Sequence, residues 1–238
     1  MTPLITVDLL HRAGVPHPDP WIVPLNSACI GADIVTPPRV ATFLGNILNE
    51  TGNLTTLAES LDYSASALVK QWPTHFDMAF ATKVGRTATH PANQIAIAER
   101  AYGGRGGNRP EGQGDGWLFR GHGCIQITFR ANYADFARRI KWAGSVDTLP
   151  AYITTVEGAS RSAAIYWQQA GCNGLADAGA WEDLRRRING GEIGMLVAME
   201  RCRQVAGLLG YSVPTGAHVG VPPVSEADAL NAAELARG

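Results

Sequence analysis

A glycine-rich stretch separates two sets of helix-like segments in this chain. The stretch from Tyr102 to Trp117, YGGRGGNRPEGQGDGW, holds too many glycines for regular structure and predicts a loop. The next segment, LFRGHGCIQIT, contains Ile125, Ile127 and Thr128, which favour a short strand or hairpin. Helix-like segments lie at about 64–71, 74–84 and 92–102 before the loop, and at about 131–140, 158–170, 178–188 and 192–208 after it. The sequence therefore predicts a mainly α protein with a small β-hairpin region.

One domain accounts for most of the 238 residues. A hydrophobic fraction of 45% is enough to form a sizeable core. Residues 1–35 contain several prolines and look irregular, and we expect them to form the N-terminal part of a domain over residues 1–210. Three prolines and two glycines between residues 213 and 224 predict a linker, and SEADALNAAELAR predicts a short final helix. Residues 211–238 are thus expected to be a tail.

Charge and hydropathy argue against several classes of protein. The formal net charge is -1 and no basic stripe is present, so we expect no nucleic-acid partner. The basic run Arg185–Arg187 is interpreted as a solvated helix face. No stretch approaches the ~18 apolar residues of a membrane span, so we expect no membrane insertion. Asp8, His11 and Arg12 interrupt the apolar residues of the N-terminus, which predicts synthesis in the cytoplasm without a signal peptide.

The cysteines and histidines show no metal-binding pattern. Cys29, Cys124, Cys172 and Cys202 form no CxxC pair and do not cluster with histidine. We expect four buried, reduced thiols, with a Cys172–Cys202 bridge as the alternative. No metal and no organic cofactor are expected.

The clearest single helix ends in a carboxylate. Thr36, followed by two prolines, is a good helix start, and Gly52 is expected to end the helix. Glu50 then lies in the last turn, on the same row as Phe43 and Ile47. The negative end of the helix dipole and apolar neighbours would both raise the pKa of Glu50, as a general acid requires. The alternative is an ordinary exposed glutamate at a helix end.

A second carboxylate, Glu59, follows nine positions later. A fully helical link would separate the two residues by ~13 Å, but Gly52 and Asn53 favour a turn that shortens the distance. Glycoside hydrolysis with inversion needs two carboxyl groups roughly 6.5–9.5 Å apart, with a water between them. The spacing permits this geometry, and Asp62 is a competing second carboxylate.

A series of motifs resembles a known enzyme family. Between about Pro24 and Leu208 the chain contains, in order, FLGNILNETGNL, AESLDYS, YGGRGGN, GDGWLFRGHGCIQITFRANY and RRRINGG. Together these motifs resemble glycoside hydrolase family 19, and most closely its short chitinase-like lysozymes found as phage endolysins. The resemblance implies a lysozyme-like or chitinase-like α+β fold with a central cleft, and a catalytic domain over residues 1–210.

The resemblance also implies roles for individual residues. Glu50 matches the proton donor, Glu59 the carboxylate that activates water, and Thr128 a hydroxyl that helps to hold that water. The amides of Gln126, Asn132 and Asn189 match groups that contact the sugar. The aromatic rings of Tyr63, Tyr102 and Trp117 supply candidate faces for sugar rings.

Each assignment has a structural alternative. Gln126, Thr128 and Asn132 could satisfy the backbone around a hairpin, and Asn189 could belong to a turn between helices. Tyr102 and Trp117 could be core aromatics.

Three residues depart from the family pattern. Asn49 stands where the family usually has histidine, His122 where it has arginine, and Phe129 where it has a small residue. Asn49 would alter how Glu50 is oriented, and Phe129 would narrow a subsite.

The predicted function is hydrolysis of β-1,4 bonds between amino sugars of bacterial peptidoglycan, by an inverting acid/base mechanism. The alternatives are a chitinase, a carbohydrate-binding module without catalysis, and a toxin delivered between bacteria with the same chemistry. We expect a monomer that is made in the host bacterial cytoplasm and reaches the cell wall after release by another agent, such as a holin.

Overall fold

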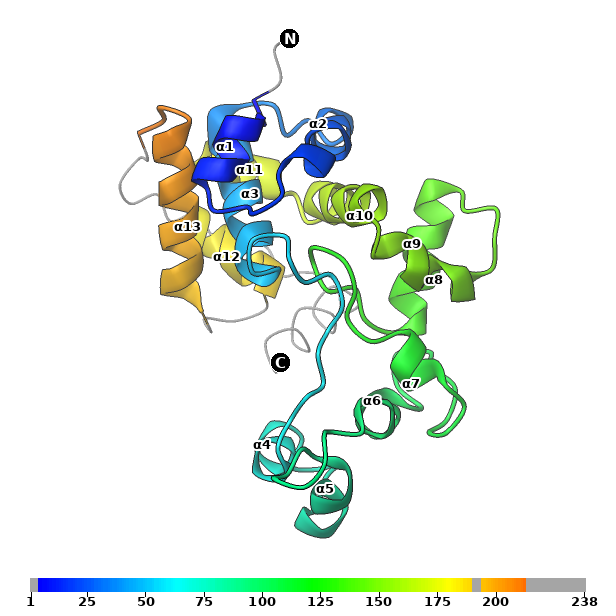
Figure 1. Ribbon diagram of the computed structural model, residues 1–238. Helices are drawn as coiled ribbons and strands as arrows, with labels where there is room; N and C mark the ends of the chain where they lie inside the picture. The colour runs from blue at the N-terminus through cyan, green and yellow to red at the C-terminus, as the bar shows by residue number, and fades with distance from the viewer. Residues whose placement is uncertain (1–3, 190–193, 213–238) are drawn as a thin grey trace. The chain divides into compact units, whose positions relative to one another are not determined.

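The computed structural model describes residues 4–189 and 194–212 (Figure 1). This part of the chain is mainly helical, which confirms the predicted fold class. It clusters into two compact units. Unit 1 contains residues 4–57, 123–125 and the described residues between 152 and 212, and unit 2 contains residues 58–122 and 126–151. The predicted tail lies outside the described residues from position 213 onward.

Unit 1 is built from helices drawn from both ends of the chain. Its elements are α1 (Val7–Arg12), η1 (Asp19–Trp21), α2 (Ile22–Gly31), α3 (Pro37–Glu50), α10 (Val156–Gln169), α11 (Cys172–Asp177), α12 (Trp181–Asn189) and α13 (Met195–Leu208). The helix α9 (Leu149–Ile153) runs across the boundary between the units.

The prediction that residues 1–35 are irregular was wrong. Thr6 caps α1 by accepting a hydrogen bond from the Leu9 amide. The prolines stand at helix starts, with Pro20 in η1 and Pro24 in the first turn of α2. A proline in the first turn removes no helical hydrogen bond, because the amides there have no partner within the helix. These prolines therefore start helices rather than prevent them.

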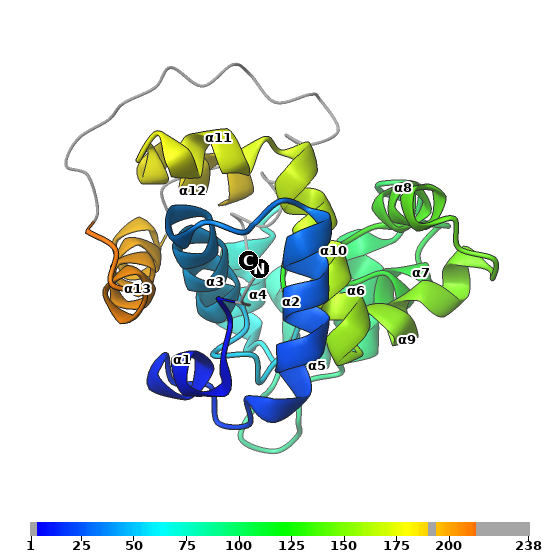
Figure 2. The same ribbon diagram turned by 90° about the horizontal axis from the view of Figure 1, so that it is seen from above.

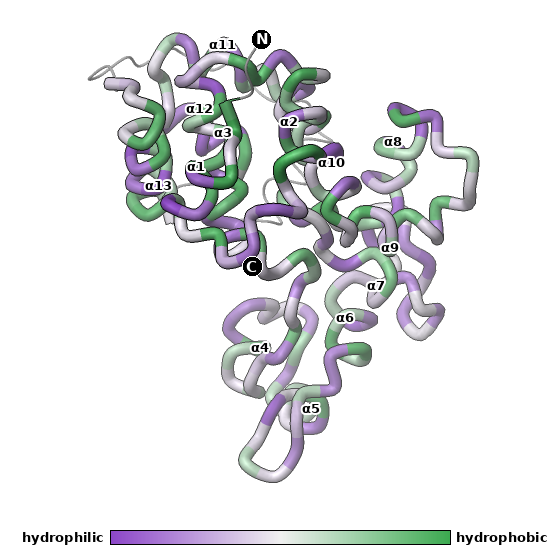
Figure 3. The backbone as a smooth tube through the Cα atoms, turned by 45° about the horizontal axis from the view of Figure 1, so that its top comes forward, coloured by the Kyte–Doolittle hydropathy of each residue, from purple (hydrophilic) through white to green (hydrophobic). Residues whose placement is uncertain are grey.

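Helix α3 lies at the centre of unit 1. All of its residues from Val40 to Leu48 are buried. Helices α13 and α11 pack against it, and Figures 1 and 2 both show α13 beside α3. Along α13, hydrophobic and hydrophilic segments alternate in Figure 3, as expected of a helix with one buried face. The two helices are closely packed at Gly45, where a Cβ atom would lie 2.6 Å from the Cα of Cys202.

Unit 2 holds a smaller aromatic core. Its helices are α4 (Ala65–Gln71), α5 (Met78–Val84), α6 (Gln94–Tyr102), α7 (Asp115–Leu118) and α8 (Arg130–Ile140), followed by η2 (Val146–Thr148). Buried aromatic side chains at the core include Trp72, Phe76, Tyr102 and Phe129. The glycine-rich loop is fixed by Asp115, which is fully buried and forms ion pairs with Arg109 and Arg130 at 2.7 Å each.

The expected β-hairpin is reduced to a single pair of residues. His122 and Ile127 exchange backbone hydrogen bonds of 3.1 and 2.9 Å, and no strand extends from them in the described part of the chain. The connection between them turns through Gly123 and Gln126, both with positive φ, and Phe129 also has a positive φ of 71°. These conformations interrupt the extended backbone that a hairpin ladder needs.

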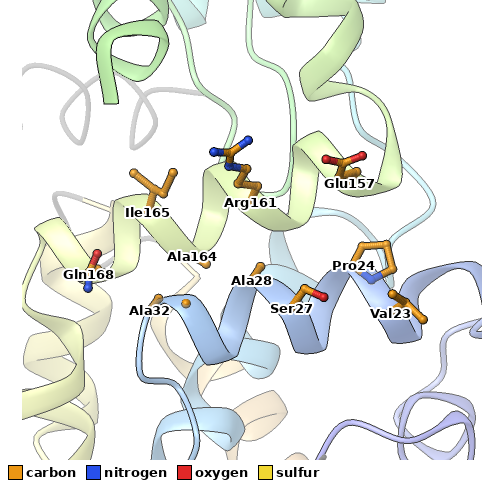
Figure 4. A pocket seen from close by; sticks show the side chains of 11 residues that line it. Val23, Pro24, Ser27, Ala28, Ala32, Glu157, Arg161, Ala164, Ile165 and Gln168 are labelled. Carbon is orange, nitrogen blue, oxygen red and sulfur yellow. The ribbon is translucent and has the colours of Figure 1, made fainter. Parts of the chain in front are cut away.

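A groove on unit 1 lies between α2 and α10 (Figure 4). Its volume is about 520 Å³, and Glu157 and Arg161 of α10 stand along one side. None of the predicted site residues lines it. Among the described residues no helix is both long and apolar enough to cross a membrane.

The four cysteines are free and buried. Cys172 and Cys202 therefore form no bridge, as the interpretation of four reduced thiols predicted. Burial raises the pKa of Cys29 to about 12, so this thiol stays protonated near neutral pH.

Because α3 and α13 pack closely, adding one methyl group at Gly45 is expected to lower the stability of the protein considerably. Gly45→Ala should destabilise the protein by about 2 kcal/mol, because the new Cβ would overlap backbone and sulfur atoms of Cys202. Gly207→Ala in α13 is the matched control, because nothing lies within 4 Å of its Cβ position. There, alanine should stabilise the helix by up to about 1 kcal/mol. Urea unfolding measures both changes, and equal stability of the two variants would contradict the packing described above.

Candidate active site

Glu50 is the last residue of α3 and lies in unit 1. The helix ends there, with Thr51 as its C-cap. The Thr51 hydroxyl donates to the Ile47 carbonyl at 2.6 Å and accepts from the Leu54 amide at 2.8 Å. These two bonds hold the turn after Glu50. The sequence therefore predicted the position of Glu50 in the helix correctly.

A buried arginine faces the Glu50 carboxylate. Arg185 of α12 donates from Nη1 to Glu50 Oε1 at 2.6 Å, and the Arg185 side chain is only 3% exposed. The same Nη1 lies 3.3 Å from Asn46 Oδ1, one turn earlier on α3. The interpretation of Arg185 as part of a solvated helix face was therefore wrong. The surroundings of Glu50 are polar as well as apolar, contrary to the sequence-based expectation.

Asn49, which departs from the family pattern, also contacts this carboxylate. Its Nδ2 lies 3.3 Å from Glu50 Oε1. Oxygen Oε1 thus receives donors from both Asn49 and Arg185, which hold the carboxylate in one orientation. Both of these hydrogen bonds end on Oε1, so Oε2 of Glu50 is the oxygen that they do not constrain.

Glu59 lies in unit 2 and is held by neutral donors. The Tyr102 hydroxyl donates to Oε1 at 2.7 Å, and the Gly121 amide donates to Oε2 at 3.2 Å. The backbone is fixed as well, since the Glu59 amide donates to the Gly121 carbonyl at 2.8 Å. Arg120 reaches the Glu59 carbonyl with its Nε at 3.3 Å. Each carboxylate oxygen keeps lone-pair capacity for one further partner, such as a water.

The surroundings of Glu59 favour the protonated form of its carboxyl group more than bulk water does. Burial raises the pKa of Glu59 above its ordinary value, while the bonds from Tyr102 and Gly121 and the charge of Arg120 act in the opposite direction. The pKa of Tyr63 is also raised, first by burial and then by the negative charge of Glu59. Tyr63 therefore lies within the electrostatic reach of Glu59.

Three polar residues predicted to contact water or sugar lie on the same segment of unit 2. The Thr128 hydroxyl donates to the Gln126 carbonyl at 2.9 Å, which leaves its oxygen able to accept. The Asn132 amide donates to the Thr128 carbonyl at 2.8 Å. The Gln126 Oε1 atom would lie 2.7 Å from a Cβ on Gly121, so this side chain packs on the loop that holds Glu59.

The three predicted aromatic faces have different surroundings. Tyr102 is 8% exposed and its ring packs edge-on against Trp72 and Phe129, so what it offers the site is its hydroxyl. Trp117 is partly exposed, and the Arg120 guanidinium lies 3.5 Å from its ring centroid. Tyr63 is partly exposed and packs edge-on against Trp72. The structural alternative thus describes the ring of Tyr102 better than a sugar-binding face does.

The structure also shows where the other residues singled out by the sequence analysis lie. Asp62 pairs with Arg86 at 3.3 Å on the surface, so the competing second carboxylate has no donors like those of Glu59. The ring of Phe129 is 3% exposed and lies against the Gly106 position, where the core rather than a subsite takes up its bulk. Asn189 ends α12, and its side chain lies outside the described residues.

The residues that contact Glu50 or Glu59 and that the sequence did not reveal are Arg185, Arg120 and Gly121. Arg185 is part of RRRINGG, but nothing in that run distinguishes a buried arginine from its exposed neighbours. In the part of the chain that the structure describes, no three His, Cys, Asp or Glu side chains gather as a metal site. Each unit holds one oriented carboxylate, and carboxyl groups are among the side chains that acid/base chemistry on a polar bond needs.

The arrangement of helices is similar to that of known chitinases. Chitinase C from Streptomyces griseus superposes with a TM-score of 0.59 at 15% identity, over 90% of this chain and 96% of that chain. A variant of chitinase C gives a TM-score of 0.58 at 13% identity, over 91% and 80% of the two chains. At these identities the likeness defines a chitinase-like fold and no more.

The sequence identifies the family. A protein of Haemophilus influenzae, described as a glycosyl hydrolase family 19 domain-containing protein, is 35% identical over 179 residues, or 75% of this chain and 82% of that protein. No family model matches the chain. The chain belongs to glycosyl hydrolase family 19 and is a glycoside hydrolase, as its motifs predicted.

The buried pair in unit 1 makes a prediction about stability. Arg185→Met should destabilise the protein by about 3 kcal/mol, because it leaves the partly buried Glu50 side chain without its ion-pair partner. Adding Glu50→Gln to Arg185→Met should restore part of the loss, because the uncompensated charge disappears. Thermal and urea unfolding of the single and double variants provide the measurement.

Arg203→Met is the matched control for this experiment. Arg203 forms an exposed pair with Glu200 at 3.9 Å, which should contribute less than about 1 kcal/mol. An Arg185→Met variant no less stable than Arg203→Met would show that the Glu50–Arg185 pair does not stabilise unit 1.

Proposed function

We propose that this chain hydrolyses β-1,4 bonds between amino sugars of bacterial peptidoglycan by an inverting mechanism. The observation that carries the proposal is the setting of Glu59. In a family 19 chain, this half-buried carboxylate is held by a tyrosine hydroxyl and a peptide N–H, with lone pairs left to bind water. Glu50, held on one oxygen by Arg185, is the partner carboxyl group.

In this mechanism two protons move. Glu50 gives its proton to the glycosidic oxygen as the bond to the anomeric carbon breaks. Glu59 takes a proton from a water molecule as that water attacks the anomeric carbon from the opposite face. The oxygen of Thr128 accepts a hydrogen bond from the same water, because its own hydrogen points to the Gln126 carbonyl. The first product then has the inverted anomeric configuration, and no cofactor takes part.

The assignment of the two roles is supported by the motifs rather than by the electrostatics. A raised pKa, as at Glu59, is the usual property of a general acid, and a cation beside a carboxylate, as at Glu50, is the usual setting of a base. The family pattern assigns the opposite roles, because Glu50 stands in NETG and Glu59 in AESLDYS. An experiment that separates the two roles is therefore needed.

Glu50→Gln and Glu59→Gln should each lower the hydrolysis rate of a natural oligosaccharide by at least about 100-fold. The acid variant Glu50→Gln should regain activity on a nitrophenyl glycoside, whose leaving group needs no proton, and Glu59→Gln should not. The reverse pattern would exchange the two roles. Proton NMR of the first product of the wild-type enzyme gives its configuration, and a product with the configuration of the substrate would exclude the inverting mechanism.

The preference for peptidoglycan is supported by the likeness of the motifs to chitinase-like lysozymes. The four free cysteines agree with it, because a secreted chitinase of the plant type would carry disulfides. Chitin is the second candidate, because the solved structures with a similar fold are chitinases. The role of a phage endolysin, which is made in the cytoplasm and reaches the wall after release by a holin, is part of the same proposal.

We expect faster cleavage of peptidoglycan than of chitin. Purified peptidoglycan and colloidal chitin are compared at equal enzyme concentration, by clearing and by release of reducing ends. Glu50→Gln is the control for binding without cleavage, and it also tests the carbohydrate-binding alternative. Faster release from chitin, with no clearing of peptidoglycan, would make the chain a chitinase and overturn the proposed substrate.

A further inference from the structure

One peptide group in unit 2 connects Glu59 to the protein core. The Arg120–Gly121 peptide donates its N–H to Glu59 Oε2 at 3.2 Å, and its carbonyl accepts from the Tyr133 hydroxyl at 3.1 Å. A trans peptide is planar and its N–H and C=O point in opposite directions, so whatever fixes the carbonyl also aims the N–H. No cis peptide occurs among the described residues.

Tyr133 is itself fixed by a buried histidine. Tyr133 and His122 are 0% and 4% exposed, and the hydroxyl oxygen lies 2.6 Å from His122 Nδ1. A tyrosine hydroxyl has one hydrogen, and the bond to the Arg120 carbonyl uses it. With that hydrogen on the carbonyl, the hydroxyl oxygen accepts from Nδ1–H in the His122 tautomer that carries its hydrogen there. The ring of Phe119, 5.1 Å away centre to centre, holds the Tyr133 ring edge-on.

The loop around Gly121 packs closely against Glu59, and this packing restricts the conformations that its backbone can adopt. A Cβ atom on Gly121 would lie 2.7 Å from Gln126 Oε1 and 3.3 Å from the Glu59 Cβ. The backbone bond from the Glu59 amide to the Gly121 carbonyl closes the other side. The peptide thus touches the carboxylate on one side and the buried Tyr133–His122 pair on the other.

We propose that His122 and Tyr133 are positioning residues for Glu59, acting through the Arg120–Gly121 peptide. The inference rests on the proposed function, in which Glu59 activates water. His122 orients the Tyr133 hydroxyl, the hydroxyl holds the Arg120 carbonyl, and the Gly121 N–H then holds Oε2 of Glu59. Neither residue touches the carboxylate itself in the contacts described above.

The charge state of His122 suits this role. Burial first, and then the positive charge of Arg120, lower the pKa of His122 to about 4, against a smaller opposing effect of its bond to the Arg120 backbone. The ring is therefore neutral at neutral pH, and as the Nδ1–H tautomer it donates to the Tyr133 hydroxyl. The titratable and charged groups that act on Glu59 are Tyr102 on α6, Arg120 on the loop and Tyr63 after the AES motif. The buried hydroxyl of Tyr133 on α8 also lies within its field.

Tyr133→Phe tests the proposal, because it removes the hydroxyl and keeps the ring. Release of the peptide should lower kcat roughly ten- to hundredfold with an unchanged KM. The Gly121 bond lowers the pKa of Glu59, so its weakening should move the acidic limb of the kcat/KM profile to higher pH. Initial rates on a soluble oligosaccharide of N-acetylglucosamine, measured across pH, give both quantities.

Two further variants calibrate the measurement. Tyr102→Phe removes the direct donor to Glu59 and should move the same limb in the same direction. Tyr152→Phe deletes a hydroxyl 3.4 Å from Glu157 in unit 1 and should leave kcat and the profile unchanged. A shift in Tyr133→Phe that Tyr152→Phe does not share supports positioning over a general effect of losing a tyrosine hydroxyl.

Variants of His122 test the second member of the pair without touching the tyrosine. An asparagine can place an amide donor near the position of Nδ1, so His122→Asn should retain more kcat than His122→Ala. Circular dichroism and thermal unfolding confirm that each variant is folded. Equal kcat values for folded His122→Asn and His122→Ala would remove His122 from the proposal.

The result for Glu59→Gln separates the two levels of inference. If Glu59→Gln is inactive while folded Tyr133→Phe keeps the wild-type kcat and pH profile, the positioning role is wrong and the proposed function stands. If Glu59→Gln keeps more than about half of the activity, Glu59 is not the base, and the positioning role fails with it. Loss of activity in Glu59→Gln together with the shifted limb in Tyr133→Phe is the expected outcome.

Discussion

The close packing of α3 against α13 at Gly45 is the constraint on which the arrangement of unit 1 depends. Because a glycine stands there, the backbone of α13 comes closer to α3 than van der Waals contact with a side-chain Cβ would allow, and α3 is buried along most of its length. A helix held this firmly can place polar groups at regular intervals on one row. Asn46 and Glu50 lie on this row, one turn apart, and the single guanidinium of Arg185 contacts both. The geometry of the Glu50 carboxylate thus follows from the packing of the helix that carries it.

Unit 2 positions the Glu59 carboxylate with a loop, rather than with a strand or a long helix. Its loop between residues 119 and 129 turns at residues with positive φ, and hydrogen bonds to buried side chains fix it in place of a β-ladder. The most buried of these side chains, Tyr133 and His122, are polar groups whose hydrogen-bonding capacity is used on the loop backbone. Burying such groups is costly unless every partner is present, so a satisfied network selects one loop conformation. Rigidity at Glu59 therefore comes from polar contacts within an aromatic core.

The sequence predicted helices well and loop conformations poorly, for physical reasons. The helix from Pro37 to Glu50 was recognisable because cap, apolar row and terminal glycine all agreed. The prediction for residues 1–35 was wrong because the presence of a proline does not tell whether it lies in the first turn of a helix or interrupts one. The hairpin was misread because Gln126 and Phe129 adopt positive φ, which only tertiary contacts impose on residues other than glycine. The motifs singled out Glu50 and Glu59 as candidates, whereas Arg185, the buried ion-pair partner of Glu50, lies in a basic run whose composition does not reveal burial.

The two carboxylates differ in the partners that hold them. Glu50 forms an ion pair with the buried guanidinium of Arg185. Glu59 is held by neutral donors, and burial is already the largest influence on its pKa. A sugar chain that covered Glu59 and excluded further water would raise the pKa of Glu59 again, because fewer water molecules would solvate its charge. The water to be activated would then be the solvent molecule that remains next to the carboxylate. A carboxylate placed in this way binds the proton of an adjacent water more strongly once the substrate has excluded the others, and its basicity then depends on the presence of the substrate.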